Sequence, residues 1–283
     1  MNEKVLIVTD STSDLGAELL EQYGVAVLPM TVTLGNTDYV DGVDIDPDQV
    51  YAHYERTGQL PKTAAINMAQ FSDYFRDYTE QGYSVVLFVI SSGMSSTYDH
   101  ACMAAEDFDN VFVVDTKNLS TGSGLLVLSA CDMAAEGKSA REIAEACAAL
   151  ASRVNASFVI DSLEFLHKGG RCSALEAYGA EFLHIKPCIA VKDGKMGVGK
   201  KYRGNFASVL ERYIADRLGD GSSVDLDRVF VTHAGCDEEL CRRCVEKVKQ
   251  IVPFCEVLLT RAGCTVSSHC GRNTLGVLFM NKA

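Results

Sequence analysis

Short apolar runs alternate with amphipathic stretches along the first half of the chain. The most apolar run is Val85–Ile90, and shorter runs of the same kind cover Val5–Val8, Val25–Met30 and Val111–Val114. Between them, apolar residues recur at helical spacing, as over Phe71–Gln81. Because strands that alternate with helices build parallel sheets, this pattern predicts a three-layer α/β/α fold with a parallel sheet.

Several helices carry their own start signals. Asp46 followed by Pro47 indicates one helix start, and Ser139 with Glu142 three residues later forms a capping box. From these signals and the spacing of apolar residues, we expect two consecutive helices at about Ser120–Glu136 and Ser139–Val154.

The pattern changes after about residue 157. Two strand-like runs, Cys188–Lys192 and Lys195–Val198, flank Asp193-Gly194, a dipeptide typical of two-residue hairpin turns, so antiparallel pairing enters here. We predict a two-domain α/β protein, with an N-terminal α/β/α parallel-sheet domain over residues 1–157 and a C-terminal α/β domain with a mixed sheet over residues 158–283. The further elements expected there are helices at Phe206–Leu218 and Asp237–Ile251 and strands at Arg228–Thr232, Cys255–Leu259 and Thr274–Met280.

The charge of the chain narrows the range of partners. Among its 283 residues, 26 are basic and 38 acidic, so the formal net charge is −12. Nucleic acid is a poor partner, since affinity for it depends on Lys and Arg that neutralise phosphates. Anionic membrane surfaces also repel such a protein, so we expect only transient membrane contact. The chain begins without a signal-peptide pattern and no apolar run approaches roughly 18 residues, so we expect a cytoplasmic protein.

The chain contains 11 cysteines, none of them before Cys102. Their number is odd and most lie in apolar or helical contexts, which favours reduced thiols that pack as small hydrophobic side chains. Cys241-x-x-Cys244 is the one spaced pair, but it lies well inside a helical pattern, whereas thioredoxin-type pairs are activated at a helix start. We interpret the cysteines as structural, with a redox or metal-binding role for this pair as the alternative.

A serine-rich turn follows the most apolar strand. Ser91, Ser92, Ser95 and Ser96 surround Gly93 between that strand and a predicted helix. Ser95 or Ser96 is placed to cap the helix, and the free N–H groups of a helix start favour a small anion beyond the strand's carboxyl end. Two interpretations stay open: the serines only cap their own helix, or the turn binds an anionic group.

The same turn resembles the Gly-x-Ser-x-Gly nucleophile elbow of α/β-hydrolases through Gly93 and Ser95. Thr97 stands where the elbow needs a small residue, and the sequence has no oxyanion segment of the His-Gly-Gly-Gly type. His233 or His269 would supply the base in the chain order of this class. A serine hydrolase acting on lipid esters, with Ser95 as nucleophile, is therefore the competing enzyme hypothesis.

Two further polar segments are candidate sites. His269 lies in a polar turn between apolar runs, where an imidazole can donate to a carboxylate or be a satisfied structural group. Lys168 and Arg171 flank two glycines, an arrangement that suits either a solvated turn or a contact with an anion or a partner protein. Both alternatives stay open for each segment.

These segments occur together, in one order, in a known family. The matching motifs are Val8-Thr9-Asp10-Ser11-Thr12-Ser13-Asp14-Leu15, Lys62-Thr63, Ser91-Ser92-Gly93-Met94-Ser95-Ser96-Thr97-Tyr98, Lys168-Gly169-Gly170-Arg171, Lys186-Pro187, and His269-Cys270-Gly271 through Gly276. In these motifs the chain resembles the DegV family of bacterial lipid-binding proteins over nearly its whole length. The resemblance implies a two-domain α/β protein that buries one long-chain fatty acid between its domains.

The resemblance also implies a binding function without chemistry of its own. Some members are the fatty-acid-binding subunit of bacterial fatty acid kinase and present the carboxyl group to a separate ATP-binding kinase subunit, which forms the acyl phosphate. Matched residue by residue, the carboxylate ligands fall on Thr63, Ser95 and His269. Arg171 matches an arginine near the pocket mouth, where it would engage the kinase or its phosphate. The resemblance implies no cofactor, metal or catalytic residue; a ligand sensor without a kinase is a third alternative.

The serine-rich turn also supplies supporting residues, for which we take Ser92, Gly93 and Ser96. The chain departs from the family pattern at three places. It has Thr63-Ala64-Ala65-Ile66 where the family usually reads Thr-Ser-Gln-Pro, Ser96 replaces a usual glycine, and Asn273 stands where glycine is common. Asn tolerates left-handed backbone angles. We therefore expect the head-group site to be retained and the pocket shape near residue 63 to differ.

Overall fold

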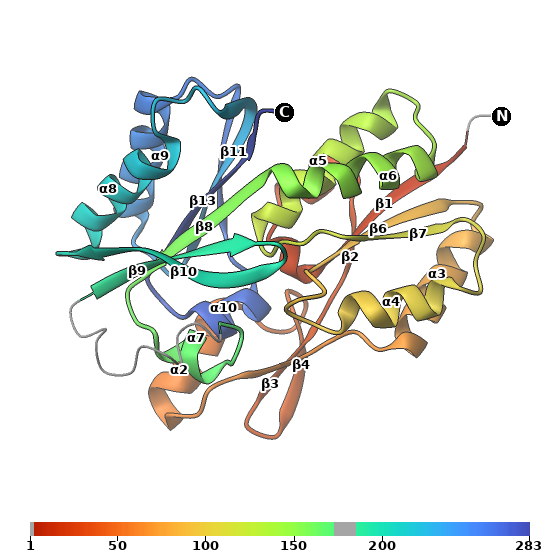
Figure 1. Cartoon of the computed structure of the whole chain (residues 1–283). Helices are drawn as coiled ribbons and strands as arrows, with labels where there is room; N and C mark the ends of the chain where they lie inside the picture. The colour runs from red at the N-terminus through yellow and green to blue at the C-terminus, as the bar shows by residue number, and fades with distance from the viewer. Residues whose placement is uncertain (1–2, 173–184) are drawn as a thin grey trace.

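The structure, a computed structural model, describes residues 3–172 and 185–283. Its first sheet is parallel, with the strand order β2-β1-β6-β7 (Figure 1). The strands are β1 (Val5–Asp10), β2 (Ala26–Leu28), β6 (Ser84–Val89) and β7 (Val111–Asp115). Every residue of β6 is buried, as a continuous apolar run predicts for a strand that is covered on both faces. The parallel sheet predicted for the first half is confirmed.

Helices cover both faces of the first sheet. Val86 and Phe88 of β6 belong to a core shared with α5 and α6, whereas Val85 and Leu87 belong to the core shared with α3 and α4. This division follows from the strand's period of two, which turns alternate side chains to opposite faces. The three-layer arrangement is therefore confirmed. The helices are α1 (Ala17–Tyr23), α3 (Met68–Glu80), α4 (Thr97–Ala105), α5 (Thr121–Ala135) and α6 (Ala140–Leu150).

The second sheet is mixed, with the strand order β10-β9-β8-β13-β11-β12. Only β11 and β12 pair in parallel among its described strands. The predicted hairpin is present, with Asp193 and Gly194 both at positive φ between β9 and β10. α8 (Phe206–Leu218) and α9 (Glu238–Ile251) pack on one face. The strands are β8 (Val154–Ile160), β9 (Ile185–Lys192), β10 (Lys195–Arg203), β11 (Val224–Ala234), β12 (Glu256–Arg261) and β13 (Thr274–Asn281).

The sequence pattern does not predict a small antiparallel sheet that forms within the first half. Its order is β4-β3-β5, with β3 (Thr31–Leu34), β4 (Thr37–Val40) and β5 (Lys62–Ala64). These strands are short and partly exposed, so they carry no long apolar run that would identify them. α2 (Pro47–Thr57) lies between β4 and β5 in the chain and begins after Asp46, as its capping residues predict.

Two short helices complete the region where the chain's halves meet. α7 (Glu164–Lys168) and α10 (Cys264–Cys270) lie together with α2 (Figure 1). The ring of Phe165 in α7 packs edge-on against Tyr51 and Tyr54 of α2, with centroids 6.5 and 4.7 Å apart. Elements from residues 47–57, 164–168 and 264–270 thus form one unit.

Two sequence expectations are wrong in their local structure. The helix expected to reach Val154 ends at Leu150, and after a short 3₁₀ helix (η2, Ala151–Arg153) Val154 begins β8, a buried strand paired with β13. His269 was expected in a polar turn but lies in the last turn of α10, because contacts from distant residues hold this short helix. β8 runs across residue 157, and the two-domain division there stays a prediction.

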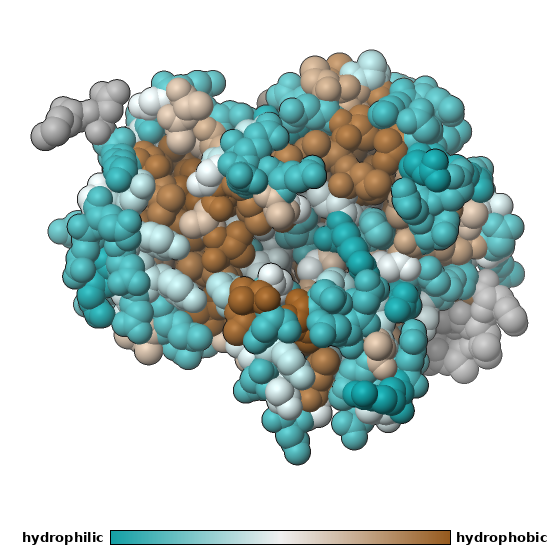
Figure 2. Space-filling model, turned by 180° about the vertical axis from the view of Figure 1, so that it is seen from behind, coloured by the Kyte–Doolittle hydropathy of each residue, from teal (hydrophilic) through white to brown (hydrophobic). Residues whose placement is uncertain are grey.

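The molecular surface is mixed in character. Seen from behind, hydrophobic residues gather beside the notch between the two halves of the molecule, and hydrophilic residues cover the outer edges (Figure 2). Within residues 3–172 and 185–283, no helix has the length and apolar character needed to cross a membrane.

Candidate functional site

Thr63 and His269 meet although 206 residues separate them. Thr63 lies on the edge strand β5 and His269 near the end of α10, and Thr63 Oγ1 lies 2.8 Å from His269 Nε2. Burial, and to a smaller extent the positive charge of Arg171, lowers the pKa of His269 to about 4. The pair is therefore a hydroxyl beside an imidazole that is neutral at pH 7.

The glycines next to Arg171 have a packing role at this imidazole. A Cβ on Gly169 would lie 2.8 Å from Nδ1 of His269, so the backbone approaches the ring only because the side chain is absent. The guanidinium of Arg171 donates to the carbonyl oxygen of Gly169 at 2.7 Å. Among the described residues, Nδ1 of His269 is buried and has no hydrogen-bond partner. The ring is thus polar, enclosed and next to a cation.

Two acidic residues from the first part of the chain hold the start of α10. Asp41 accepts hydrogen bonds from the first two N–H groups of the helix at 2.9 and 3.1 Å, and Asp14 accepts the N–H of Gly263 at 2.7 Å. Such contacts satisfy the free donors of a helix start. Because α10 is short, these contacts determine its position and therefore the position of His269.

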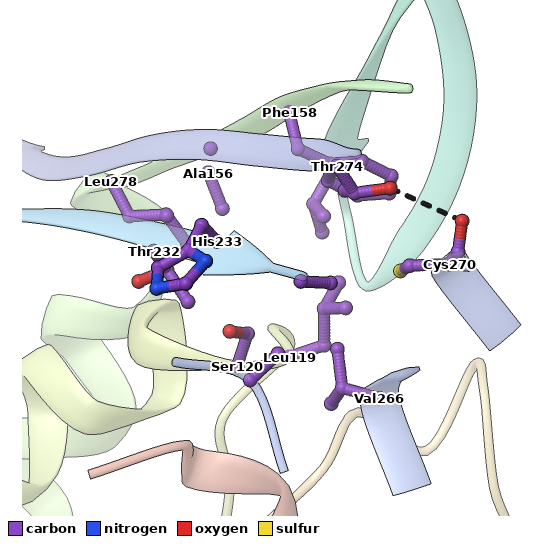
Figure 3. Close-up of a pocket in the computed structure, with 14 residues that line it drawn as sticks. Leu119, Ser120, Ala156, Phe158, Thr232, His233, Val266, Cys270, Thr274 and Leu278 are labelled. Atoms are coloured by element: carbon purple, nitrogen blue, oxygen red, sulfur yellow. Dashed lines mark hydrogen bonds between the residues drawn. The ribbon is translucent and has the colours of Figure 1, made fainter. Parts of the chain in front are cut away.

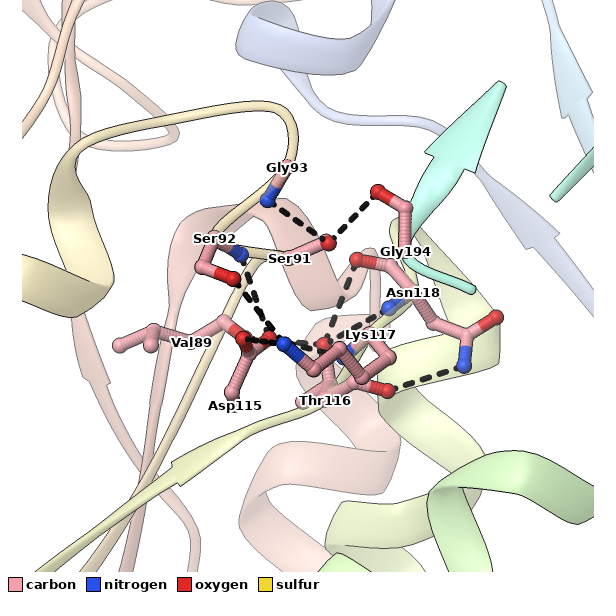
Figure 4. Close-up of polar contacts among 9 residues, drawn as sticks. All are labelled: Val89, Ser91, Ser92, Gly93, Asp115, Thr116, Lys117, Asn118 and Gly194. Carbon is pink, nitrogen blue, oxygen red and sulfur yellow. Dashed lines mark hydrogen bonds and ion pairs between the residues drawn. The ribbon is translucent and has the colours of Figure 1, made fainter. Parts of the chain in front are cut away.

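The serine-rich turn is tied to the β9–β10 hairpin. Ser91 Oγ donates to the carbonyl oxygen of Gly194 at 2.7 Å and accepts the N–H of Gly93 at 3.1 Å (Figure 4). A Cβ on Gly93 would lie 2.5 Å from that carbonyl oxygen, so the contact requires glycine there. The turn and the hairpin, from different sheets, therefore fit directly against each other.

The neighbouring serine is held by a charged pair. The N–H of Ser92 donates to Asp115 at 3.2 Å, and its hydroxyl accepts from Nζ of Lys117 at 3.1 Å, while Lys117 and Asp115 form an ion pair of 2.6 Å (Figure 4). Hydrogen bonds from Lys117 and Ser92 keep the pKa of Asp115 below its ordinary value against the opposing effect of burial. Asp115 thus remains ionised at neutral pH and holds the turn through the N–H of Ser92.

Ser95 rather than Ser96 caps α4. Ser95 Oγ accepts the N–H of Thr97 at 3.3 Å and lies 2.8 Å from Thr97 Oγ1. Ser96 occupies the cap position itself but makes no side-chain capping bond. Ser95 thus holds the first N–H of the helix and also lines a cavity, which is compatible with both interpretations of the turn.

Four of the candidate side chains line one cavity: Thr63, Ser95, Arg171 and His269. We call it the hydroxyl-lined cavity. Ser92, Gly93 and Ser96 are not among its lining residues; they belong to the serine-rich turn beside it. Apolar residues complete the wall: Met30, Ala65, Ile90, Met94, Leu119, Met196, Val266 and Cys270.

A second cavity, the apolar chamber, adjoins the first. It lies on the face of the second sheet that α8 and α9 leave free. Figure 3 shows Ala156, Phe158 and Leu278 on one side of it and Leu119 and Val266 on the other. Leu119, Val266 and Cys270 line both cavities and so form a waist between them. Together the cavities offer a polar end and an apolar extension.

Sequence reasoning missed the waist and the supports of α10. Leu119 lies in a loop without a strong pattern, between Lys117 and Ser120, two residues at positive φ. Backbone strain of this kind is concentrated at functional sites, but no sequence signal reveals it. The two acids that hold α10 are recognisable only as polar residues near turns.

The geometry gives the hydrolase hypothesis no nucleophile–base pair. The hydrogen bonds of the Ser95 hydroxyl are to Thr97, His269 pairs with Thr63, and His233 accepts the N–H of Cys236. In the described ranges, no group of three or more His, Cys, Asp or Glu side chains is arranged to hold a metal ion.

Comparisons with known proteins extend over the whole chain. The family model described as "Uncharacterised protein, DegV family" matches residues 4–282. A DegV domain-containing protein of Clostridium perfringens is 36% identical over 285 residues, with 99% of each chain covered. A fatty-acid-binding DegV family protein from Thermus thermophilus has a similar structure, with a TM-score of 0.89, 28% identity and coverage of 99% of this chain and 100% of that chain. A stearic acid-binding protein from Eubacterium ventriosum has a TM-score of 0.84 and 29% identity, with 98% of each chain covered. The chain belongs to the DegV family.

Proposed function

We propose that this chain binds one long-chain fatty acid, with the carboxylate beside Thr63, Ser95 and His269 and the acyl tail in the apolar chamber. The observation that carries the proposal is the 2.8 Å pairing of Thr63 with His269 in a cavity that adjoins an apolar chamber. The fatty-acid-binding relatives from Thermus thermophilus and Eubacterium ventriosum share the fold over nearly the whole chain, which supports the same ligand class here.

The two cavities divide the free energy of binding between them. Each buried methylene contributes roughly 0.8 kcal/mol, so a tail of about sixteen carbons gains on the order of 12 kcal/mol before the costs of association. A carboxylate is costly to bury without partners, and hydroxyl and imidazole donors meet that need. Thr63, Ser95 and His269, whose Nδ1 has no hydrogen-bond partner among the described residues, are such groups, and the charge of Arg171 favours an anion beside them. The tail supplies affinity and the polar end supplies orientation.

We further infer that the bound carboxyl group is handed to a separate ATP-binding kinase subunit, which forms the acyl phosphate. Arg171 lines the cavity and is itself exposed, so the carboxyl end lies near the surface while the tail lies inside. In this role the chain presents a substrate and catalyses no step, and the handover takes place in the cytoplasm, where ATP is available.

Lipid analysis of the purified protein tests the binding proposal. The protein is isolated without detergent, the lipid is extracted, and the extract is quantified by mass spectrometry. We expect one fatty acid per chain. Recovery of a nucleotide, or of no ligand both before and after incubation with hexadecanoic acid, would reject the proposal.

A kinase reconstitution separates presentation from simple sensing. The protein loaded with hexadecanoic acid is mixed with a fatty acid kinase subunit and ATP, and the acyl phosphate is trapped with hydroxylamine. We expect acyl hydroxamate only when both proteins are present. Loaded protein that binds its lipid stoichiometrically but yields no product with cognate kinase subunits supports the sensor alternative instead.

A further inference from the structure

One histidine and two cysteines lie close together beside the apolar chamber. His233 lies near the end of β11, Cys236 in the following loop and Cys241 near the start of α9. Asp237 is the N-cap of α9, which puts Cys236 one residue before the cap and Cys241 at the fourth helical position. Side chains at these two positions commonly pack together and are usually apolar. Here both positions hold a thiol.

The contacts of Cys236 tie it to the chamber wall. Its thiol donates to the carbonyl oxygen of Thr274 at 3.3 Å, and its N–H donates to Nδ1 of His233 at 3.3 Å. Thr274 and His233 both line the chamber. Cys236 is half-buried, whereas Cys241 is 1% exposed. The pair is therefore open to solvent only at Cys236, and Cys241 is enclosed behind it.

The two thiols differ in how readily they lose a proton, since their pKa values are shifted in opposite directions. The hydrogen bond from Cys236 is the largest influence on Cys241 and lowers its pKa well below the ordinary value; burial opposes this, and a hydrogen bond from His233 lowers it further. The same thiol–thiol hydrogen bond, together with burial, raises the pKa of Cys236. Since the thiolate is the nucleophilic form of cysteine, Cys241 is the reactive sulfur and Cys236 the neighbouring thiol.

We propose that Cys236 and Cys241 form a peroxide-reactive dithiol that closes reversibly to a disulfide. The Cys241 thiolate attacks one oxygen of a peroxide, the O–O bond breaks, and Cys241 becomes a sulfenic acid while hydroxide leaves and is protonated to water. The sulfur of Cys236 then attacks that of Cys241, the S–O bond breaks, and the hydroxyl leaves as water with the Cys236 proton. Two thiols are oxidised, one peroxide is reduced to two waters, and a thiol reductant reverses the change.

The spaced pair visible in the sequence is not the reactive one. Cys244 lies three residues after Cys241 on the same helix, and burial raises its pKa to about 12. Its sulfur therefore stays protonated at neutral pH and fits the structural interpretation. Cys236, which no spacing rule identifies, is the partner because the chain turns at Asp237 and brings it against the first turns of α9.

Peptide mapping of the oxidised wild-type protein tests this inference. One equivalent of hydrogen peroxide is added, the remaining thiols are alkylated, and the protein is digested without reductant. We expect a peptide that joins Cys236 to Cys241, an intact mass lower by two hydrogen atoms, and full reversal by a thiol reductant. A link between Cys241 and Cys244, or a pair that stays reduced while the exposed Cys255 is oxidised, would overturn the proposal.

Three serine variants sharpen the result. Cys236→Ser is expected to stop at a sulfenic acid on Cys241, which dimedone traps, and Cys241→Ser is expected to slow oxidation of Cys236 by about tenfold or more. Cys244→Ser is the matched control, a buried thiol on the same helix, and should form the disulfide at the wild-type rate. Loss of the disulfide in a folded Cys244→Ser protein contradicts the assignment. Circular dichroism verifies that each variant folds. If a variant unfolds, the peptide mapping of the oxidised wild-type protein alone tests the proposal.

Discussion

The hydroxyl-lined cavity and the apolar chamber share a waist but are built in different ways. The polar side chains of the first come from β5, the turn before α4, the segment after α7 and the end of α10, which are far apart in the chain. The chamber is largely one face of the second sheet, with lining residues from β8, β11 and β13. The polar end thus depends on contacts between distant segments, whereas the apolar end follows from the side-chain alternation of neighbouring strands.

This difference separates two tasks that a fatty-acid site must combine. An apolar chamber stabilises any tail that fits it, in proportion to the area removed from water. A carboxylate requires donors at defined positions, and a small displacement of α10 or of the serine-rich turn would remove them. The supports of these two elements, Asp41, Asp14 and the Ser91–Gly194 contact, are therefore as much part of the site as its lining.

Of the changes proposed, blocking the waist should weaken fatty-acid binding the most. Leu119 lines both cavities and is 6% exposed, so Leu119→Trp should keep the tail out of the chamber. If about five methylenes lose their burial, binding weakens by roughly 4 kcal/mol, or about a thousandfold. Competition binding with hexadecanoic and decanoic acids measures this, and the loss should be confined to the longer acid. Leu119→Ala serves as the control and should retain the longer acid; an equal loss for both acids in Leu119→Trp would refute the division into two cavities.

The imidazole of the polar end predicts a pH dependence of stability. In the lipid-free protein, burial lowers the pKa of His269 to about 4, below the ordinary value of 6.5. Between these two pH values the unfolded chain binds a proton at this residue that the folded protein does not bind. The contribution of His269 to the free energy of unfolding is therefore complete above about pH 7 and is lost as the pH falls to about 4. The loss is on the order of 3 kcal/mol. Urea unfolding of wild type and His269→Gln across this range measures it.

The difference between the two proteins isolates His269 from other titrating groups. Burial raises the pKa of Asp10 to about 6 and of Asp14 to about 8, so these acids stabilise the folded protein more as the pH falls, the opposite trend. They titrate in both proteins and cancel in the comparison. Parallel curves for wild type and His269→Gln would show that the imidazole is not buried and neutral.

Removing a hydroxyl from the polar end should weaken acids selectively. Thr63→Val and Ser95→Ala each delete a donor for the carboxylate, which costs roughly 1.5–3 kcal/mol for a hydrogen bond to a charged group, or about ten- to a hundredfold in Kd. Hexadecanol fills the same chamber without a charge, so its Kd should change much less. Ser96→Ala is the matched control, since that hydroxyl lies one residue away and does not line the cavity. A similar loss in Ser96→Ala, or an equal loss for the alcohol, contradicts the head-group assignment.

The sequence predicts much of the fold because local physics determines it. The run Val85–Ile90, the capping residues Asp46 and Ser139 and the Asp193-Gly194 turn each appear in the structure close to where the pattern indicates. The strands β3, β4 and β5 lack such signals, because they are short and partly exposed. α10 is missed for a different reason: its start is held by Asp41, more than two hundred residues earlier.

The site shows the same limit. Family motifs predict Thr63, Ser95 and His269 as carboxylate ligands, and all three line one cavity in the structure. No local pattern indicates that Thr63 touches His269, since the contact depends on how β5 and α10 pack together. The waist at Leu119 and the thiol pair near α9 are likewise products of tertiary packing.

The smallest expected effect is on the rate of fatty-acid exchange, and it comes from the β9–β10 hairpin beside the hydroxyl-lined cavity. Met196 of β10 lines the hydroxyl-lined cavity, and the hairpin tip is held by the bond from Ser91 to Gly194. A Cβ on Gly194 would lie 2.6 Å from Ser91 Oγ, so Gly194→Ala should loosen the tip and speed fatty-acid exchange several-fold, as measured by transfer of a fluorescent fatty acid to vesicles. Gly137→Ala is the matched control, because Gly137 also has a positive φ, of 84° against 77°, but its Cβ would meet open space. Both variants should lose roughly 1–2 kcal/mol of stability from the left-handed backbone alone. Since only Gly194→Ala disturbs the contact between the two sheets, equal exchange rates in the two variants would show that the hairpin does not control access to the cavity.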